Sequence, residues 1–270
     1  MTFMRRAYQV DSGLFPVSRF TEKDWRVLRW GYYRMIEKVD AHIGDLLAAL
    51  RQSGLEENTL VVFTSDHGDC AGAHRFNQKT VFYDESARVP LVIACRGRTA
   101  GSTTDELVNT GIDLLPTMLD FAGLAIPAKL PGRSLLPLVF GQPVDAWRDY
   151  VVVENNMTQT GEIDGLRPQM EGRMVRTDRY KYCVFSHGQR RESLVDMQAD
   201  PGETTDLAAD PKYRPVLLAH RELLQKFARE HSDPLVAKLL ADDVKPIPFS
   251  ASDAPADPPR VKRKAKSASR

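Results

Sequence analysis

The longest regular pattern of apolar and polar positions lies in residues 21–54. Apolar side chains recur there every three or four positions, the spacing of one helix face: Trp25, Leu28, Tyr32, Met35, Ile36, Val39, Ile43, Leu46 and Leu50. Thr21 suits the N-cap, with acidic Glu22 and Asp24 in the first turn. Gly54 suits the left-handed position that ends a helix. The pattern predicts one long helix with one apolar face.

Shorter patterns follow this helix. Residues 59–64 and 90–95 are apolar runs that predict buried strands, separated by a long loop. Residues 113–122 predict a helix, with Pro116 expected in its first turn, where proline is tolerated. This order of helix, strand, loop, strand and helix predicts α/β layering.

Beyond residue 146 the pattern predicts an antiparallel sheet. Short strands separated by turns are expected at residues 150–155, 173–177, 180–185 and 192–197. A helix is expected to open at Asp210-Pro211, with Val216, His220, Leu223 and Phe227 on one face. We therefore expect an α/β domain over 1–145, a smaller α+β subdomain over 146–240 and a disordered basic tail over 241–270.

Charge and composition narrow the classes of function. The net charge is +1, but residues 260–270 hold six basic side chains and no acid, so the rest of the chain is mildly acidic. This balance gives no indication of nucleic-acid binding, and the tail is expected to be solvated. Three cysteines are too few for a disulfide framework or a zinc site. We expect no transmembrane segment and recognise no signal peptide, which leaves localisation open.

The chemistry of the chain is concentrated after the run Leu60–Phe63. There Ser65, Asp66, His67 and Gly68 follow the end of a predicted strand. Because α/β sheets bind ligands beyond the carboxyl ends of their strands, Asp66 and His67 are positioned to hold a divalent cation. The alternative is that Asp66 caps the next turn and His67 is a core histidine. The residues alone leave both alternatives open.

A longer series of motifs follows in a fixed order. It consists of Asp66-His67-Gly68, Gly72-x-His74, Lys79, Arg88-Val89-Pro90, Asp113-x-x-Pro116-Thr117 and Asp200-Pro201-Gly202-Glu203. This series resembles the sulfatase family of the alkaline-phosphatase superfamily over most of residues 20–230. The resemblance implies a partial sulfatase-like sandwich of sheet and helices, followed by the smaller subdomain, and an enzyme that hydrolyses sulfate esters of small molecules or carbohydrates.

The resemblance also implies roles for single residues. Asp66 and His67 would be metal ligands, with calcium as the usual ion and magnesium or manganese as alternatives. Lys79 would offer its ammonium group to a sulfate oxygen. His74 would carry a proton or orient Lys79, or do neither. Outside the site, we expect Arg88 to form a salt bridge within its loop and Asp69 to cap a turn.

Half of the family's active site is not recognisable in residues 1–270. Sulfatases carry paired metal-binding aspartates and, soon after them, Cys-x-Pro-x-Arg or Ser-x-Pro-x-Arg, whose Cys or Ser becomes the formylglycine nucleophile. We find neither in that context. The chain therefore resembles the carboxyl-terminal portion of a sulfatase, and we expect it to be poorly soluble and inactive towards aryl sulfates by itself. An amino-terminal portion of the same enzyme is a candidate partner.

Two alternatives to a sulfatase stay open. The first is a phosphonate monoester or phosphodiester hydrolase of the same superfamily, because sulfuryl and phosphoryl groups differ little in size and charge. The second is a non-catalytic remnant or binding protein.

Overall fold

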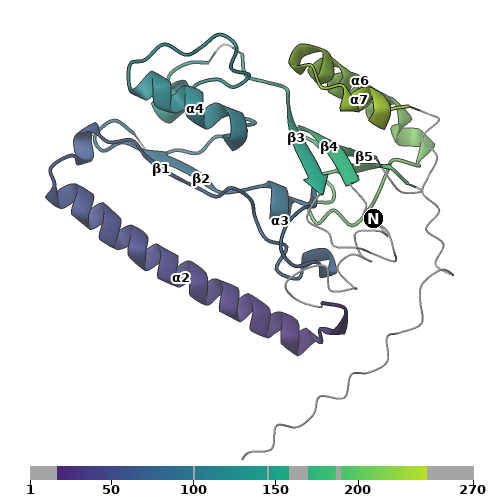
Figure 1. Ribbon diagram of the computed structural model, residues 1–270, viewed down its shortest axis with the longest axis horizontal. Coiled ribbons are helices and arrows are strands. Elements are labelled where there is room, and N and C mark those ends of the chain that lie inside the picture. The colour runs from purple at the N-terminus through teal and green to yellow at the C-terminus, as the bar shows by residue number, and fades with distance from the viewer. Residues whose placement is uncertain (1–16, 100, 145, 158–169, 187–189, 242–270) are drawn as a thin grey trace, which may run out of the picture.

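A computed structural model describes residues 17–99, 101–144, 146–157, 170–186 and 190–241 (Figure 1). Helix α2 (Glu22–Gln52), strands β1 (Val61–Thr64) and β2 (Leu91–Ala94), and helix α4 (Thr110–Phe121) come first. A four-stranded sheet follows, with helices α6 (Arg214–His231) and α7 (Leu235–Leu239) packed against it. The shorter helices are η1 (Val17–Arg19), η2 (Glu56–Asn58), η3 (Ala73–Arg75), α3 (Asp84–Ala87), α5 (Leu136–Val139) and η4 (Pro211–Tyr213).

Helix α2 has the predicted ends. Thr21 Oγ1 accepts a hydrogen bond from the Asp24 N–H at 3.3 Å, and the Asp24 carboxylate accepts one from the Thr21 N–H at 2.8 Å. This reciprocal pair is a capping box. Gly54 follows in the left-handed conformation, with φ of 72°. Of the predicted apolar face, however, only Trp25 is buried, so most of this face lacks a covering layer in the described part of the chain.

Strands β1 and β2 form a two-stranded antiparallel sheet. Thr64, the last residue of β1, pairs with Leu91, the first residue of β2. Strand β1 begins two residues later than predicted, and β2 is one residue shorter than predicted at each end. The loop that connects them carries the candidate site residues. It therefore begins and ends at the same end of the two-stranded sheet.

Helix α4 begins earlier than predicted. Asn109 is its N-cap and accepts a hydrogen bond from the Gly111 N–H at 3.0 Å. Pro116 therefore lies in the middle of the helix, and the prediction that it occupies the first turn is wrong. Pro116 has no N–H for the Ile112 carbonyl. Gly132 approaches that carbonyl so closely that a Cβ at position 132 would lie 1.9 Å from its oxygen.

The Asp113-x-x-Pro116-Thr117 motif is buried and structural. Both carboxylate oxygens of Asp113 accept hydrogen bonds from the Arg148 guanidinium, at 2.7 and 2.6 Å. Thr117 donates its hydroxyl to the Asp113 carbonyl at 2.7 Å and accepts the Leu135 N–H at 2.9 Å. The motif thus joins α4 to the chain on both sides of α5.

The second sheet is antiparallel, as predicted. Its order is β3 (Tyr150–Met157), β4 (Met170–Thr177), β5 (Tyr180–Phe185) and β6 (Glu192–Asp196). One side packs on α6 and α7 through a core that includes Val175, Leu194, Leu217, Leu224 and Leu239. Asp210 caps the short helix η4, so α6 begins at Arg214 rather than at the predicted position 210.

The domain boundaries remain predictions. The tail predicted over 241–270 lies outside the described residues, except for Ala241. No helix within the described ranges has the length and apolar character that crossing a bilayer requires.

Candidate active site

The loop after β1 brings together three of the predicted site residues. His67 Nε2 lies 2.7 Å from Lys79 Nζ and 3.4 Å from Asp66 Oδ2. An imidazole, a carboxylate and an ammonium group therefore meet just beyond the carboxyl end of β1. This is the region of an α/β sheet where ligands bind.

The orientation of His67 defines which ring nitrogen faces the site. Its Nδ1 lies 2.8 Å from the Gly68 carbonyl oxygen, which can only accept a hydrogen bond. Nδ1 therefore carries the proton, and the lone pair of Nε2 is directed towards Lys79 and Asp66. A histidine that binds a metal commonly has this arrangement, in which a carbonyl holds the second ring nitrogen.

Asp66 is suited to remain ionised. Its side chain is 83% exposed. Partial desolvation raises the pKa of Asp66, but the hydrogen bond from the His67 N–H, at 3.0 Å, and the His67 ring outweigh it, so the net pKa is below its usual value. A carboxylate near the Nε2 lone pair favours a positive charge beside Nε2, and the Lys79 ammonium group lies 2.7 Å from that nitrogen.

The donor set fits a divalent cation only in part. Asp66 and His67 offer one oxygen-bearing and one nitrogen ligand, whereas calcium takes six to eight oxygen ligands. Among the described residues, no group of three or more His, Cys, Asp or Glu side chains could hold a metal ion. These two residues therefore account for a fraction of a metal centre, and the other ligands must come from water, a substrate or other protein groups.

Asp69 caps a turn, as predicted. Its Oδ1 accepts hydrogen bonds from the N–H groups of Ala71 at 2.7 Å and Gln78 at 3.1 Å. The Cys70 N–H also donates to the Gln78 carbonyl at 2.8 Å, so both ends of the loop are fastened next to Lys79. Five non-glycine residues of this loop have a left-handed backbone: Ala71, His74, Arg75, Gln78 and Thr80. Such conformations are costly and persist where surrounding contacts enforce them.

His74 is held against helix α3. Its ring stacks on Tyr83 with centroids 3.6 Å apart, and its Nε2 lies 3.6 Å from a Glu85 carboxylate oxygen. These contacts attach the loop to α3, and the catalytic role of His74 remains a prediction. The salt bridge predicted for Arg88 is wrong for the described residues: Arg88 is exposed and its side chain forms no ion pair with them.

A buried ionic cluster also holds helix α3 in place. Glu203 Oε1 accepts the Asp84 N–H at 2.7 Å and the Lys181 ammonium at 2.7 Å. Lys181 also donates to the Phe82 carbonyl at 3.0 Å and to the Asp84 carboxylate. One sequence signal points to this cluster, the Asp-Pro-Gly-Glu motif that ends at Glu203, whereas no signal identifies Lys181 as its partner.

Helix α3 in turn positions the loop that bears His67. The Ser86 carbonyl accepts the Gly68 N–H at 2.8 Å. Gly68 lies so close to α3 that a Cβ there would be 2.0 Å from the Glu85 carbonyl oxygen. The glycine of the Asp-His-Gly motif is therefore required by a close approach of two backbones, and its carbonyl orients His67.

We expect Gly68→Ala to lower the free energy of unfolding by about 1–3 kcal/mol, the usual cost of forcing an extra carbon into a packed site. Gly31→Ala in α2 is the matched control, because nothing lies within 4 Å of a Cβ there. Alanine favours a helix over glycine, so this control is expected to stabilise by about 0.5–1 kcal/mol. Urea denaturation of both variants measures the difference, and equal effects would contradict the close approach.

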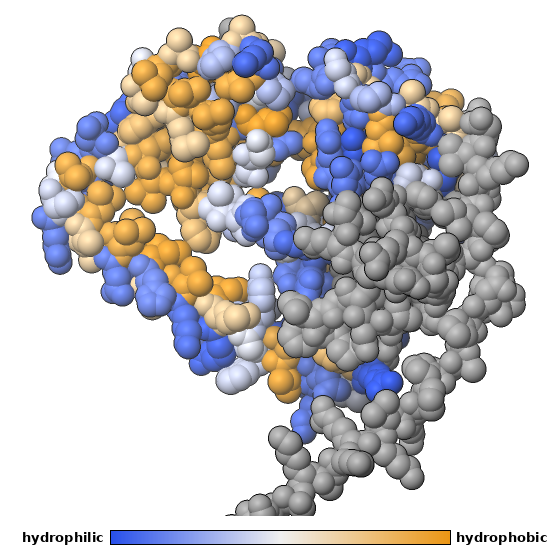
Figure 2. Space-filling model, viewed as in Figure 1, coloured by the Kyte–Doolittle hydropathy of each residue, from blue (hydrophilic) through white to orange (hydrophobic). Residues whose placement is uncertain are grey.

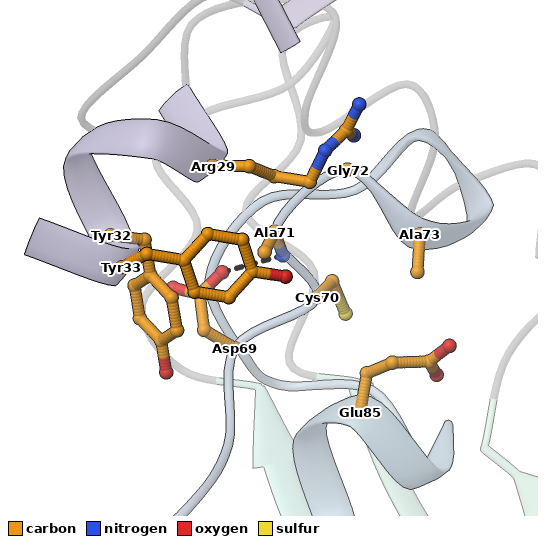
Figure 3. Close-up of a pocket in the computed structure, with 9 residues that line it drawn as sticks. All are labelled: Arg29, Tyr32, Tyr33, Asp69, Cys70, Ala71, Gly72, Ala73 and Glu85. Carbon is orange, nitrogen blue, oxygen red and sulfur yellow. Dashed lines mark hydrogen bonds between the residues drawn. The ribbon is translucent and has the colours of Figure 1, made fainter. Parts of the chain in front are cut away.

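A cavity of about 440 Å³ lies on the α2 side of the same loop (Figure 3). Arg29, Tyr32 and Tyr33 of α2 line it opposite Asp69 and Cys70. Burial raises the pKa of the Cys70 thiol to about 12. Cys70 is therefore protonated at neutral pH and is unsuited to act as a nucleophile.

Comparisons with known proteins find matching family profiles and relatives. Residues 72–230 match the family profile "N-sulphoglucosamine sulphohydrolase, C-terminal", and residues 16–124 match the profile "Sulfatase". The chain is 36% identical over 219 residues to Delta 4,5-hexuronate-2-O-sulfatase of Bacteroides thetaiotaomicron, which covers 80% of this chain and 44% of that protein.

Solved structures show the same fold. A putative sulfatase from Bacteroides thetaiotaomicron superposes with a TM-score of 0.76 and 31% identity over 86% of this chain and 50% of that one. The phosphonate monoester hydrolase of Agrobacterium radiobacter superposes with a TM-score of 0.69 and 32% identity over 79% of this chain and 44% of that one. The chain thus spans half or less of the length of these relatives.

These likenesses confirm the predicted fold class, an α/β fold of the alkaline-phosphatase and sulfatase type. Sulfatases generally bind a divalent metal, and the assignment of Asp66 and His67 as its ligands stays a prediction. The matches cover both the loop after β1 and the second sheet. The chain belongs to the sulfatase family.

Proposed function

We propose that this chain contributes Asp66, His67 and Lys79 to the active site of a sulfuric ester hydrolase that acts on sulfated carbohydrates. The observation that carries the proposal is the meeting of these three groups at the end of β1, within 3.4 Å of His67 Nε2. The substrate class is supported by the likeness to a hexuronate-2-O-sulfatase.

The cation held by Asp66 and His67 is proposed to be calcium, with magnesium and manganese as alternatives. When bound, it would offset negative charge on the sulfate oxygens. Asp66 would ligate it through its ionised carboxylate and His67 through Nε2, the nitrogen that the Gly68 carbonyl leaves free of a proton. The remaining ligands would come from groups outside this pair.

Lys79 is proposed to bind the sulfate group of the substrate. Its ammonium group lies 2.7 Å from His67 Nε2, the atom proposed to bind the metal. Because two cations repel each other, a bound metal would displace the ammonium group towards an anion nearby. There it would donate hydrogen bonds to sulfate oxygens, on which charge accumulates as the ester bond breaks. The contacts of His74 with Tyr83 and Glu85 favour a positioning role for His74 over proton transfer.

Two alternatives are each supported by a specific observation. The likeness to a phosphonate monoester hydrolase, at 32% identity, supports hydrolysis of phosphonate or phosphate esters. The incomplete metal centre of the described residues supports a non-catalytic remnant or binding protein. Parallel assays with p-nitrophenyl sulfate and p-nitrophenyl phenylphosphonate, using protein isolated from its native cells, distinguish the three.

In that preparation we expect faster hydrolysis of the sulfate ester, and Lys79→Ala is expected to lower kcat about 100- to 1,000-fold, as loss of a group that stabilises an oxyanion does. Lys38→Ala on the exposed surface of α2 is the control and should retain full activity. Residues 1–270 produced alone are expected to show no turnover. Unchanged activity of Lys79→Ala would contradict the proposed role, and faster turnover of the phosphonate would favour the first alternative.

A further inference from the structure

The cavity between α2 and the loop after β1 combines aromatic and hydrogen-bonding side chains. Tyr32 and Tyr33 follow Arg29 by three and four positions in α2, so the three side chains lie on one side of the helix. Asp69 and Glu85 line the cavity opposite them (Figure 3). Its volume of about 440 Å³ is within the range of about 300–1,000 Å³ that is usual for small-molecule sites. The cavity is therefore large enough for a sugar ring.

The polar groups of this lining have hydrogen-bonding capacity left over. Within the described part of the chain, the Arg29 guanidinium forms no ion pair or hydrogen bond, and the hydroxyls of Tyr32 and Tyr33 form no hydrogen bond. Asp69 accepts two N–H groups with Oδ1, so Oδ2 is left for a ligand. The Glu85 carboxylate contacts one imidazole at 3.6 Å and retains acceptor capacity.

These groups favour an uncharged ligand that carries several hydroxyls. The lining has one positive charge, on Arg29, and two negative charges, on Asp69 and Glu85. A sulfate or carboxylate in the cavity would face two carboxylates, and a cation would face the guanidinium. A hydroxyl both donates and accepts hydrogen bonds, so one sugar ring can satisfy acids and guanidinium together. The tyrosine rings supply apolar surface for the C–H groups of such a ring.

The two walls of the cavity are held together at Gly72. This residue has φ of 99°, and a Cβ there would lie 2.8 Å from the Trp25 ring and 3.0 Å from an Arg29 guanidinium nitrogen. Trp25 is the buried residue of α2. The helix and the loop therefore approach each other closely, and the cavity is formed without a ligand.

The cavity differs from the rest of the inner side of α2. Figure 2 shows hydrophobic atoms along the side of α2 that is turned towards the rest of the described chain, and hydrophilic atoms on its outer side. Met35 and Val39 belong to this exposed apolar surface, which offers no hydrogen bonds. The polar lining is confined to the part of α2 that lies next to the loop after β1.

The loop after β1 connects the cavity with the candidate active site. Residues 69–73 line the cavity, and His67 and Lys79 flank this segment in the sequence. Asp69 Oδ1 accepts the Gln78 N–H at 3.1 Å, so the cavity wall is bonded to the residue that precedes Lys79. On the basis of the proposed function, we propose that the cavity binds an uncharged sugar unit next to the sulfated unit of an oligosaccharide substrate.

Binding of neutral disaccharides to protein isolated from its native cells tests the inference. Saturation-transfer NMR titrations with lactose, cellobiose and chitobiose measure the affinity. We expect at least one of them to bind, and Tyr33→Ala and Arg29→Ala to weaken its binding about tenfold, as loss of a central contact does. Tyr33 is 60% exposed, so its truncation is expected to leave the fold intact. Trp30→Ala is the matched control, because Trp30 is an exposed aromatic residue of α2 that does not line the cavity.

Three results would overturn the inference. They are no binding of any of the three disaccharides, binding that Tyr33→Ala and Arg29→Ala weaken no more than Trp30→Ala does, and binding of glucuronate that is tighter than that of the disaccharides and is lost in Tyr33→Ala. The last result would assign the cavity to an anionic sugar instead.

Hydrolysis kinetics separate this inference from the proposed function. Tyr33→Ala is expected to raise the KM for a sulfated form of the bound disaccharide about tenfold, with kcat unchanged, as loss of uniform substrate binding does. Turnover of p-nitrophenyl sulfate, which has no second sugar, should stay at the wild-type level. Disaccharide binding without any sulfate-ester hydrolysis would remove the proposed function and leave a sugar site. Hydrolysis of p-nitrophenyl sulfate without disaccharide binding would do the reverse.

Discussion

Lys181→Met is expected to lower the free energy of unfolding by about 3–5 kcal/mol, the cost of removing one partner from a buried ionic cluster. The Lys181 side chain is 1% exposed, and its ammonium group donates to the Phe82 carbonyl and to the carboxylates of Asp84 and Glu203. Methionine has a similar length but no charge, so two carboxylates would remain next to each other without a cation.

The decrease in the free energy of unfolding of Lys181→Met is expected to depend on pH. Burial raises the pKa of Glu203, and Lys181 opposes that rise, so the pKa should rise further in Lys181→Met. When the pKa of a carboxyl group is higher in the folded state than in the unfolded state, the fold loses stability as the pH rises from the lower pKa to the higher one. We therefore expect a larger loss at pH 7 than at pH 4.5.

Urea denaturation at these two pH values measures both effects. Lys212→Met, at an exposed position, is the control and is expected to change stability by less than about 0.5 kcal/mol. A loss for Lys181→Met no larger than that of the control would show that the cluster does not stabilise α3.

Asp113→Ala is expected to have a similar effect, about 3–5 kcal/mol, at a second buried ion pair, that of Asp113 with Arg148. Asp113 is fully buried and accepts two hydrogen bonds from Arg148 and one each from the N–H groups of Asn109 and Arg133. Alanine would leave a guanidinium and two backbone donors without this acceptor. Asp120→Ala, exposed on the same helix, is the matched control and should lie within about 0.5 kcal/mol of the wild type.

A double-mutant cycle with Arg148→Ala isolates the pair. Because removal of Arg148 eliminates the unpaired charge, the double variant is expected to lose less stability than the sum of the two single losses. Strict additivity of the two losses would contradict a direct role for the ion pair.

Local patterns predicted those elements whose ends are set by nearby residues. Helix α2 begins at a Thr21–Asp24 capping box and ends before Gly54, and both signals lie within a few residues of the ends they define. Helix α4 shows the opposite case, because the sequence pattern does not indicate its cap at Asn109 and so predicts Pro116 in the first turn. The periodicity of α2 correctly predicted an apolar face, but it contained no information on what covers that face.

The site was predictable to the extent that it lies within one loop. Asp66, His67 and Lys79 belong to a single connection between two strands, so a short series of motifs placed them together. The ionic cluster behind α3 joins Asp84 to Lys181 and Glu203, positions that are 97 and 119 residues away. A periodic pattern contains no information on contacts between residues so far apart in the sequence. These contacts form only when the chain folds and the second sheet brings the residues together.

Electron paramagnetic resonance of Mn²⁺ tests the central claim most directly. In dilute solutions of the chain, we expect bound Mn²⁺ to show spin-echo modulation from one imidazole nitrogen, which is lost in His67→Ala. We also expect weaker binding in Asp66→Asn, displacement of Mn²⁺ by Ca²⁺, and no change in His74→Ala. Modulation that persists in His67→Ala, or Mn²⁺ binding unaffected by both site variants, would contradict a metal centre formed by Asp66 and His67.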